Sequence, residues 1–176
     1  YVRGIQKNGT SACPKHYACN NQEYNRCKND SRLSERALRE IYLRGFEIAV
    51  RKGKAQTVMT TYGIVNGLWT ASSFDLNTVI LRDEWGFDGV VISDWGAIIQ
   101  CVQHCYTENE KEAARIALNN GCDIEMCSYA YVDNFKELLD EGAITMEQID
   151  SAVMRILKLK EKEWEHCYIF LFLHTL

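Results

Sequence analysis

An apolar run that ends in a carboxylate and an aromatic ring is the first candidate for chemistry in this sequence. Residues 90–92 (VVI) lead through Ser93 directly into Asp94 and Trp95. A carboxylate placed there can attack or stabilise an electrophile, and an indole ring beside it suits a flat apolar surface such as one face of a sugar ring. The alternative is structural, because Asp often caps the loop or helix that follows a strand. The residues alone leave both interpretations open.

Other polar side chains accompany the ends of strand-like segments. Lys15 and His16 end one such segment, and Tyr62 ends another. Lys15 and His16, together with Arg26, could supply charged hydrogen-bond donors for sugar hydroxyls. Glycosidases need two carboxyl groups, one as nucleophile or base and one as proton donor. The sequence contains no nucleophile elbow, phosphate-cradling glycine loop or GxGxxG motif that would favour another chemistry.

The elements that would position these residues alternate between strand and helix. Hydrophobic periodicity predicts strands over four segments, the first of them weak because Pro14 interrupts it: 11–16, 57–62, 88–93 and 122–126. It predicts helices over five: 34–52, about 73–85, 107–119, 131–141 and 145–162.

Capping signals and an apolar stripe support these helices. Ser34 can cap the first one, and the pairs Thr107/Glu110 and Thr145/Gln148 have the spacing of capping boxes. The first helix is predicted to bury one apolar face, formed by Leu38, Ile41, Tyr42, Phe46 and Ala49.

The alternation predicts an α/β fold built from parallel βα repeats. A complete eightfold barrel typically needs about 250 residues, so 176 residues fit either a small open sheet or half of a TIM-type (β/α)8 barrel. Polar residues at the carboxyl ends of parallel strands meet at one rim, where active sites are built. We therefore expect Lys15, Tyr62 and Asp94 to converge at one mouth of the sheet.

Composition argues against several classes of partner. The net charge is −4 without a block of like charge, so binding to nucleic acid or to an anionic membrane surface is not expected. No apolar run reaches the roughly 18 residues of a membrane helix, and residues 1–10 lack the features of a signal peptide. The compartment stays open between cytoplasm, periplasm and secretion.

The eight cysteines do not form a recognisable metal motif. Cys101 and Cys105 with His104, and the pair Cys122 and Cys127, fit no common zinc spacing. We interpret the cysteines as thiols and expect neither a metal nor another cofactor.

Five motifs follow one another along the chain: KHYxxNNQExxR (15–26), VMTTY (58–62), NG (66–67), ILRxEWGFxG (80–89) and SDWGA (93–97). Together they resemble glycoside hydrolase family 3, and more narrowly its β-glucosidase branch. The likeness runs from about Tyr1 to Lys162. It implies that residues 1–162 are the second half of the family's N-terminal catalytic barrel domain.

The resemblance also implies roles for individual residues. Asp94 takes the position of the nucleophile in a retaining enzyme that releases terminal β-D-glucose from a β-glucoside or oligosaccharide. Trp95 resembles the aromatic residue that lines the entrance. Positions that bind the sugar next to the scissile bond correspond to Lys15, His16, Arg26 and Tyr62.

Several departures from the family pattern limit this interpretation. Gly63 follows Tyr62 where a polar residue is usual, and Cys127 follows Met126 where Pro is common. The earlier half of the barrel and the α/β sandwich domain that carries the acid/base Glu have no counterpart, and Glu23, Glu84 or Glu125 cannot be assigned that role. Residues 163–176 form an unpatterned apolar tail. We therefore do not expect the isolated chain to carry out the full reaction.

Two alternatives remain beside the β-glucosidase interpretation. One is a β-xylosidase or another exo-glycosidase of the same family, although the Asp94-Trp95 pair favours a glucosidase. The other is a non-catalytic carbohydrate-binding or scaffold protein. The presence of Lys15, His16 and Asp94 together argues against a protein that has lost its catalytic residues.

Overall fold

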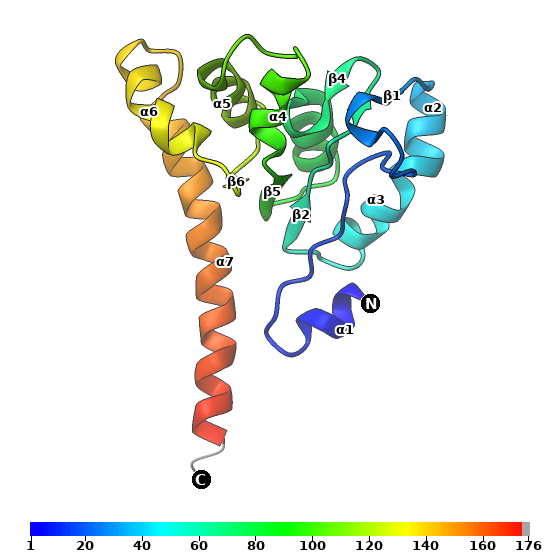
Figure 1. The fold of residues 1–176 in the computed structure, drawn as a ribbon. Coiled ribbons are helices and arrows are strands. Elements are labelled where there is room, and N and C mark those ends of the chain that lie inside the picture. Colours follow the sequence, from blue (N-terminus) through cyan, green and yellow to red (C-terminus); the bar gives the residue numbers. More distant parts are fainter. Residues whose placement is uncertain (174–176) are drawn as a thin grey trace.

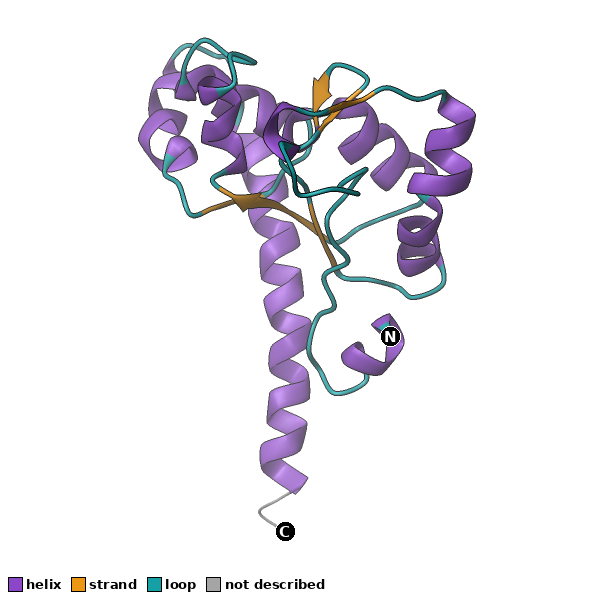
Figure 2. Cartoon of the chain, turned by 45° about the vertical axis from the view of Figure 1, so that its right-hand side comes forward, coloured by secondary structure: helices purple, strands orange, loops and turns teal. Residues whose placement is uncertain are grey.

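The structure is a computed structural model that describes the backbone of residues 1–173 and the side chains of residues 1–163. Its centre is a parallel sheet in the order β2 (Thr57–Met59), β5 (Val90–Trp95) and β6 (Ile124–Met126). Figure 2 shows these short strands with helices gathered around them and one long helix running past. The predicted α/β class with parallel βα repeats is confirmed. Within the described residues the sheet stays open, as part of a barrel would.

The first predicted strand, 11–16, is not a regular strand. Its backbone nevertheless lies parallel to β2, because Met59 N donates to Pro14 O at 3.2 Å and Tyr17 N donates to Met59 O at 2.8 Å. A single bridge pairs Tyr17 with Thr60. Pro14 has no N–H to donate, so a continuous ladder cannot form through this residue.

The helices connect the strands and cover the sheet (Figure 1). The α-helices are α1 (Val2–Gln6), α2 (Glu35–Ala37), α3 (Arg44–Arg51), α4 (Ala97–Gln103), α5 (Glu110–Asn119), α6 (Ala130–Asp140) and α7 (Met146–Leu173). Two segments are π-helical, η2 (Leu38–Tyr42) and η4 (Asp75–Glu84), and two are short 3₁₀ turns, η1 (Arg26–Lys28) and η3 (Thr70–Ser72).

The first predicted helix, 34–52, is present, but its buried face differs from the prediction. Ser34 Oγ caps it by accepting from Ala37 N at 3.2 Å. At η2, Leu43 N donates to Leu38 O, five residues back, which inserts one extra residue into that turn. Leu43 therefore becomes fully buried, whereas Ile41 is 68% exposed. The expectation that Ile41 and Tyr42 pack in the core was wrong, since Tyr42 is also exposed.

Of the two capping boxes predicted from the sequence, the structure contains one. The Thr145/Gln148 box is confirmed at α7, since Gln148 N donates to Thr145 Oγ1 at 3.3 Å and Gln148 Oε1 accepts from Thr145 N at 2.8 Å. The Thr107/Glu110 box was wrong. Asn109 caps α5 instead, with its side chain accepting from Glu112 N at 2.8 Å.

Two further helices differ from expectation. The sequence did not predict α4, which lies between β5 and α5. Helix α7 was expected to end at 162, yet its backbone continues to Leu173 and extends far beyond the rest of the molecule (Figure 1). For the predicted apolar tail, residues 174–176 and the side chains from residue 164 onward lie outside the described part.

A second small sheet joins the segment that precedes α2 to the connection that follows β2. It contains β1 (Asp30–Ser31), β3 (Ile64–Val65) and β4 (Leu68–Trp69), with β1 and β3 parallel and β3 and β4 antiparallel. Asn66 and Gly67 form the hairpin turn between β3 and β4, both with positive φ (51° and 87°). The hairpin thereby draws the segment around residue 30 onto the connection after β2.

A buried carboxylate joins four elements at the amino-terminal ends of the strands. Asp123, with a side chain 1% exposed, accepts from Val91 N at 2.8 Å and from Arg82 Nη2 at 2.6 Å. Its other oxygen accepts from Arg155 Nε at 2.9 Å. Because Arg82 belongs to η4 and Arg155 to α7, Asp123 fixes both of these helices to the sheet.

Candidate active site

The carboxyl end of β5 presents Asp94 in a tightly bonded stretch of backbone. Ser93 is fully buried, and its hydroxyl donates to Asp94 O at 3.0 Å and accepts from Met126 N at 2.9 Å. Gly96 N donates to Met126 O at 2.7 Å. The pairing of β5 with β6 is irregular between Ile92 and Trp95. The Ser93 hydroxyl therefore bridges the two strands at the point where their regular ladder is interrupted.

The Asp94 carboxylate is mostly buried, with its side chain 10% exposed. Its Oδ1 accepts from Trp95 N at 2.8 Å. Its Oδ2 lies 3.4 Å from His16 Nε2, and the His16 ring is 24% exposed. His16 comes from the extended segment beside β2, and the Lys15–His16 peptide bond is cis. Two segments that are far apart in the sequence thus meet at one carboxylate.

Tyr62 and Arg26 lie beside this carboxylate. The Tyr62 hydroxyl donates to Trp95 O at 2.8 Å. Burial, and next the charge of Asp94, raise the pKa of Tyr62 to about 12. The Arg26 guanidinium lies 4.5 Å from the centroid of the Tyr62 ring, a cation–π contact, and Arg26 also pairs with Glu23 at 2.8 Å. A neutral phenol therefore lies beside the Asp94 carboxylate, and the Arg26 cation lies over the ring of that phenol.

The last two predicted site residues face outward. Trp95 shares its backbone with the site, but its side chain leaves the residue 64% exposed. Lys15 is exposed, and among residues 1–163 it makes no hydrogen bond or ion pair. The structure thus brings Asp94, His16, Tyr62 and Arg26 into contact, whereas Lys15 is adjacent only through its peptide bond to His16.

The remaining carboxylates singled out in the sequence are already bound by other groups. Glu125 accepts from Ala130 N at 3.0 Å and Tyr131 N at 2.7 Å at the start of α6, and from the Ser128 hydroxyl. Glu84 holds Arg39 Nη2 at 2.9 Å. With Glu23 paired to Arg26 at 2.8 Å, each of the three carboxylates has a partner of its own within the described residues.

Two supporting residues carried signals that sequence reasoning did not use. Asn66 accepts from Leu33 N at 2.9 Å and donates to Leu33 O at 3.0 Å, which fastens the connection that carries Arg26. Asn-Gly between apolar residues is a strong hairpin signal, so this turn was predictable. Ser93 lies inside the quoted SDWGA motif, but its bridging role depends on where β6 lies.

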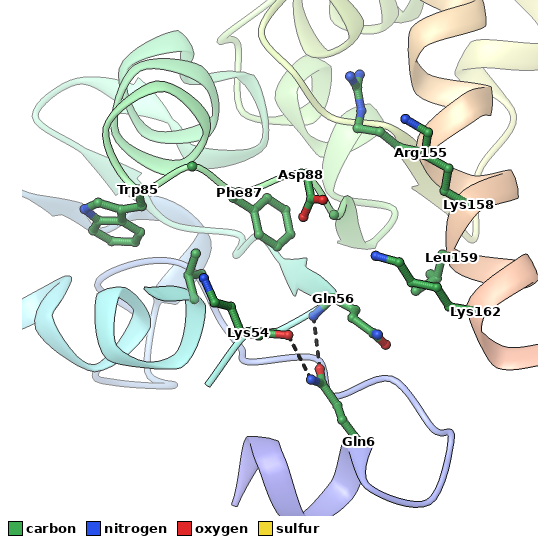
Figure 3. A pocket seen from close by; sticks show the side chains of 14 residues that line it. Gln6, Lys54, Gln56, Trp85, Phe87, Asp88, Arg155, Lys158, Leu159 and Lys162 are labelled. Carbon is green, nitrogen blue, oxygen red and sulfur yellow. Dashed lines mark hydrogen bonds between the residues drawn. The ribbon is translucent and has the colours of Figure 1, made fainter. Parts of the chain in front are cut away.

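A cavity of about 430 Å³ lies at the opposite ends of the strands. Figure 3 shows Gln6 on one side of it, donating to Lys54 O at 2.8 Å and accepting from Gln56 N at 3.1 Å, with Phe87 and Arg155 further along the lining. These residues precede β2 and β5 or belong to α7. In parallel α/β folds, residues at this end of the strands mainly serve stability, so we place the candidate site at Asp94.

Two other kinds of site are absent from the described residues. This part of the chain contains no cluster of His, Cys, Asp and Glu that could hold a metal ion. Of the helices described, none combines the length and apolar character that crossing a membrane would require.

The chain is similar to known glycosidases over most of its length. The family model described as glycosyl hydrolase family 3 N terminal domain matches residues 1–159. A β-glucosidase from Ruminococcus albus is 48% identical over 159 residues, which covers 89% of this chain and 16% of that protein. An exo-α-(1→6)-L-arabinopyranosidase from Bifidobacterium longum is 39% identical over 161 residues, covering 92% of this chain and 20% of that protein.

A solved structure supports the same relationship. The crystal structure of β-glucosidase from Listeria innocua in complex with glucose superposes with a TM-score of 0.84 at 34% identity, covering 92% of this chain and 24% of that one. The chain thus spans less than a quarter of the length of these three relatives. Sequence and fold agree that the chain belongs to glycoside hydrolase family 3, within its N-terminal domain.

Proposed function

We propose that this chain supplies the nucleophile and part of the glucose-binding site of a retaining β-glucosidase. The observation that carries the proposal is the mostly buried Asp94 carboxylate, contacted by His16 at the carboxyl rim of a parallel sheet. That rim is where enzymes with this architecture assemble their catalytic residues. The β-glucosidase names of relatives such as the one from Ruminococcus albus support the substrate class.

The two carboxylate oxygens of Asp94 have different surroundings, which suggests different tasks. Oδ1 is held by Trp95 N, so it orients the group. Oδ2 faces His16 across 3.4 Å and is the oxygen free to form a bond. In a retaining reaction, Oδ2 bonds to the anomeric carbon while the bond from that carbon to the leaving oxygen breaks. Water then attacks the same carbon and restores the carboxylate.

The proton for the leaving oxygen must come from a second carboxyl group. Glu23, Glu84 and Glu125 are engaged elsewhere. We propose that the proton donor belongs to a part of the protein beyond this chain, together with the missing half of the barrel. The hydrolytic activity is then a property of the larger protein.

The residues around Asp94 fit the binding of a sugar ring. Arg26 and Lys15 offer charged donors for hydroxyl groups, which make strong hydrogen bonds, and the ring nitrogens of His16 can also bond to a hydroxyl. Tyr62 holds the end of β5 through Trp95 O, and Trp95 presents an exposed indole face. No cofactor is needed for this chemistry.

A second candidate specificity has support among the relatives. One relative of 39% identity is named an exo-α-(1→6)-L-arabinopyranosidase, so similar sequences are assigned to a different sugar. A panel of aryl glycosides with glucose, xylose and arabinopyranose would separate these specificities in the full-length protein. A scaffold without chemistry would hydrolyse none of them.

A fluorosugar tests the role of Asp94 in this chain itself. A 2-deoxy-2-fluoro-β-glucoside with a dinitrophenyl leaving group needs little acid assistance, because the phenolate leaves as a stabilised anion. We expect mass spectrometry to find the fluoroglucosyl group on the peptide that contains Asp94, and to find none on Asp94→Ala. Asp88→Ala, at the opposite ends of the strands, is the matched control and should label normally. A label on another carboxylate would overturn the assignment.

The full-length protein allows a kinetic test. Asp94→Ala should lower turnover of an aryl β-glucoside by several orders of magnitude, as loss of a covalent catalyst does. Azide should restore part of the rate and give a glycosyl azide of inverted configuration. Lys15→Ala and His16→Ala should weaken binding without azide rescue. Near-full activity of Asp94→Ala would contradict the proposal.

A further inference from the structure

Two consecutive and fully buried residues, Trp69 and Thr70, lie where the β3–β4 hairpin ends and η3 begins. The Thr70 hydroxyl donates to Thr61 O at 2.6 Å and accepts from Thr61 N at 3.3 Å. In addition, Thr70 N donates to Gly63 O at 3.2 Å. Because Thr61 and Gly63 are the chain neighbours of Tyr62, Thr70 holds the backbone on both sides of Tyr62.

The adjacent Trp69 binds the other connection of the candidate site. Its indole N–H donates to Ala97 O at 2.9 Å, at the start of α4 and two residues beyond Trp95. The Trp69 ring also stacks on the His104 ring, with centroids 5.6 Å apart. One dipeptide therefore contacts the connection after β2 through Thr70 and the segment after β5 through Trp69.

A buried amide from η4 holds this dipeptide in turn. Asn77 is fully buried, and its Nδ2 donates to Thr70 O at 2.9 Å and to Ala71 O at 3.4 Å. Because a buried carbonyl that loses its donor costs free energy, these bonds favour a single position for the backbone of Thr70. The Thr70 hydroxyl is therefore presented to Thr61 from a backbone that the core fixes.

The position of the Tyr62 backbone matters because of what the Tyr62 hydroxyl holds. This hydroxyl donates to Trp95 O at 2.8 Å, beside Asp94. A shift of about 1 Å in Tyr62 would take this bond beyond the distances at which hydrogen bonds form in proteins. The contacts of Thr70 and Trp69 thus reach the two sides of Asp94 by separate routes.

We propose that Thr70 and Trp69 are positioning residues for Asp94, the first acting through Tyr62 and the second acting on the segment that follows Asp94. This inference rests on the proposed function, since it takes Asp94 as the group that reacts. Both side chains are fully buried, so neither can contact a sugar. Their effect falls on how fast Asp94 reacts.

The rate at which the 2-deoxy-2-fluoro-β-glucoside labels Asp94 tests the inference in the chain itself. Thr70→Val replaces the hydroxyl by a methyl group and should slow labelling about ten-fold or more, since a misplacement on the order of 1 Å is enough for a loss of this size. Thr70→Ser keeps a hydroxyl and should label close to the parent rate.

Thr57→Val is the matched control, because Thr57 is 4% exposed and its hydroxyl donates to Ala12 O at 3.1 Å at the opposite end of β2. This substitution removes the same kind of buried hydrogen bond. Its loss of stability should therefore resemble that of Thr70→Val, whereas its labelling rate should stay at the parent value.

A double-mutant cycle distinguishes positioning from a general loss of structure. If Thr70 acts through Tyr62, Thr70→Val should slow labelling in the parent and add little in the Tyr62→Phe background. Trp69→Phe keeps an aromatic ring but loses the N–H that binds Ala97 O. Because its route does not include Tyr62, Trp69→Phe should slow labelling by a similar factor in both backgrounds.

Each outcome decides one part of the proposal. Parent-rate labelling in Thr70→Val, or an equal slowing in both backgrounds, overturns the role of Thr70 and leaves the proposed function standing. Parent-rate labelling in Trp69→Phe overturns the role of Trp69, and this variant carries the test if circular dichroism shows that Thr70→Val does not fold. If the parent chain is not labelled at Asp94, the proposed function fails and the positioning roles fail with it.

Discussion

The Tyr62 hydroxyl donates a hydrogen bond of 2.8 Å to the carbonyl oxygen of Trp95. This bond joins the connection after β2 to the end of β5, immediately beside Asp94. Because Arg26 lies over the same phenol ring at 4.5 Å, the connection that carries Arg26 is joined to the two strands through one side chain. The position of Asp94 therefore depends on Tyr62 as well as on its own strand.

The first prediction concerns the pH dependence of stability at Tyr62. Its folded-state pKa of about 12 lies above the ordinary value near 10, so the folded protein holds the phenol proton more tightly than the unfolded chain. The resulting stabilisation is complete below about pH 10 and is lost as pH rises toward 12. Tyr62→Phe should make the fall in unfolding free energy over this window shallower, as measured by urea denaturation.

At neutral pH the same substitution removes one hydrogen bond and should cost about 1 kcal/mol. Tyr24→Phe is the control, since Tyr24 is 89% exposed and should change neither the neutral stability nor the alkaline slope. Burial also raises the pKa values of Tyr17 and Tyr131, so part of the alkaline slope should remain. An identical slope in Tyr62→Phe and the parent would contradict the assignment.

The second prediction concerns the buried ion pairs of Asp123. Asp123→Asn removes the charge shared by Arg82 and Arg155 and should lower the free energy of unfolding by about 3 kcal/mol, because it leaves Arg82 in a site where burial already lowers its pKa. Glu112→Gln breaks the more exposed pair with Arg115 and should cost less than about 1 kcal/mol. Equal losses of unfolding free energy in Asp123→Asn and Glu112→Gln, measured by chemical denaturation, would count against a stabilising role for the Asp123 ion pairs.

The third prediction concerns the bridge at Ser93. Ser93→Ala removes the bond to Asp94 O and leaves Met126 N without its acceptor, so the stability should fall by about 2 kcal/mol. Ser151→Ala, on an exposed face of α7, should stay within about 0.5 kcal/mol of the parent. In hydrogen exchange, the Met126 amide should lose protection in Ser93→Ala. Unchanged protection of this amide would argue against the bridge.

The fourth prediction compares two side chains around the π-helical turn. Leu43→Ala removes a fully buried side chain and should cost about 3 kcal/mol. Ile41→Ala, at a 68% exposed position, should stay within about 0.5 kcal/mol of the parent. Thermal melts of the two variants would test the register directly. A larger loss of stability in Ile41→Ala than in Leu43→Ala would instead support the regular helical register that periodicity predicts.

The sequence predicted those features that depend on local pattern. The Thr145/Gln148 box and the strands around 58 and 91 follow from neighbouring residues, and the structure confirms them. The register of the first long helix was not predictable in the same way. A regular period of 3.6 residues places Ile41 inward, but packing favours an extra residue at η2, which a single sequence does not reveal.

The site was predictable only in part, for a similar reason. The motif places Asp94 at a strand end, and the resemblance to the family suggests His16 and Tyr62 as its neighbours. The contacts that hold the end of β5 around Asp94 use backbone atoms, namely Met126 N from β6 and Trp95 O from β5 itself, and the positions of backbone atoms do not depend on residue type. Roles such as that of Ser93 appear only once β6 is placed.

The Asp123 pairs also have a consequence for how the chain is made. Arg82 precedes Asp123 by 41 residues, and Asp123 precedes Arg155 by 32. At synthesis rates of about 5 to 20 residues per second, roughly 2 to 8 s separate the appearance of Arg82 from that of its carboxylate, and a further interval of similar length precedes Arg155. On the ribosome, η4 and β5 therefore cannot be joined through Asp123 until that carboxylate emerges, and α7 is fastened to it only after the second interval. The first interval is when a chaperone would find η4 and β5 accessible.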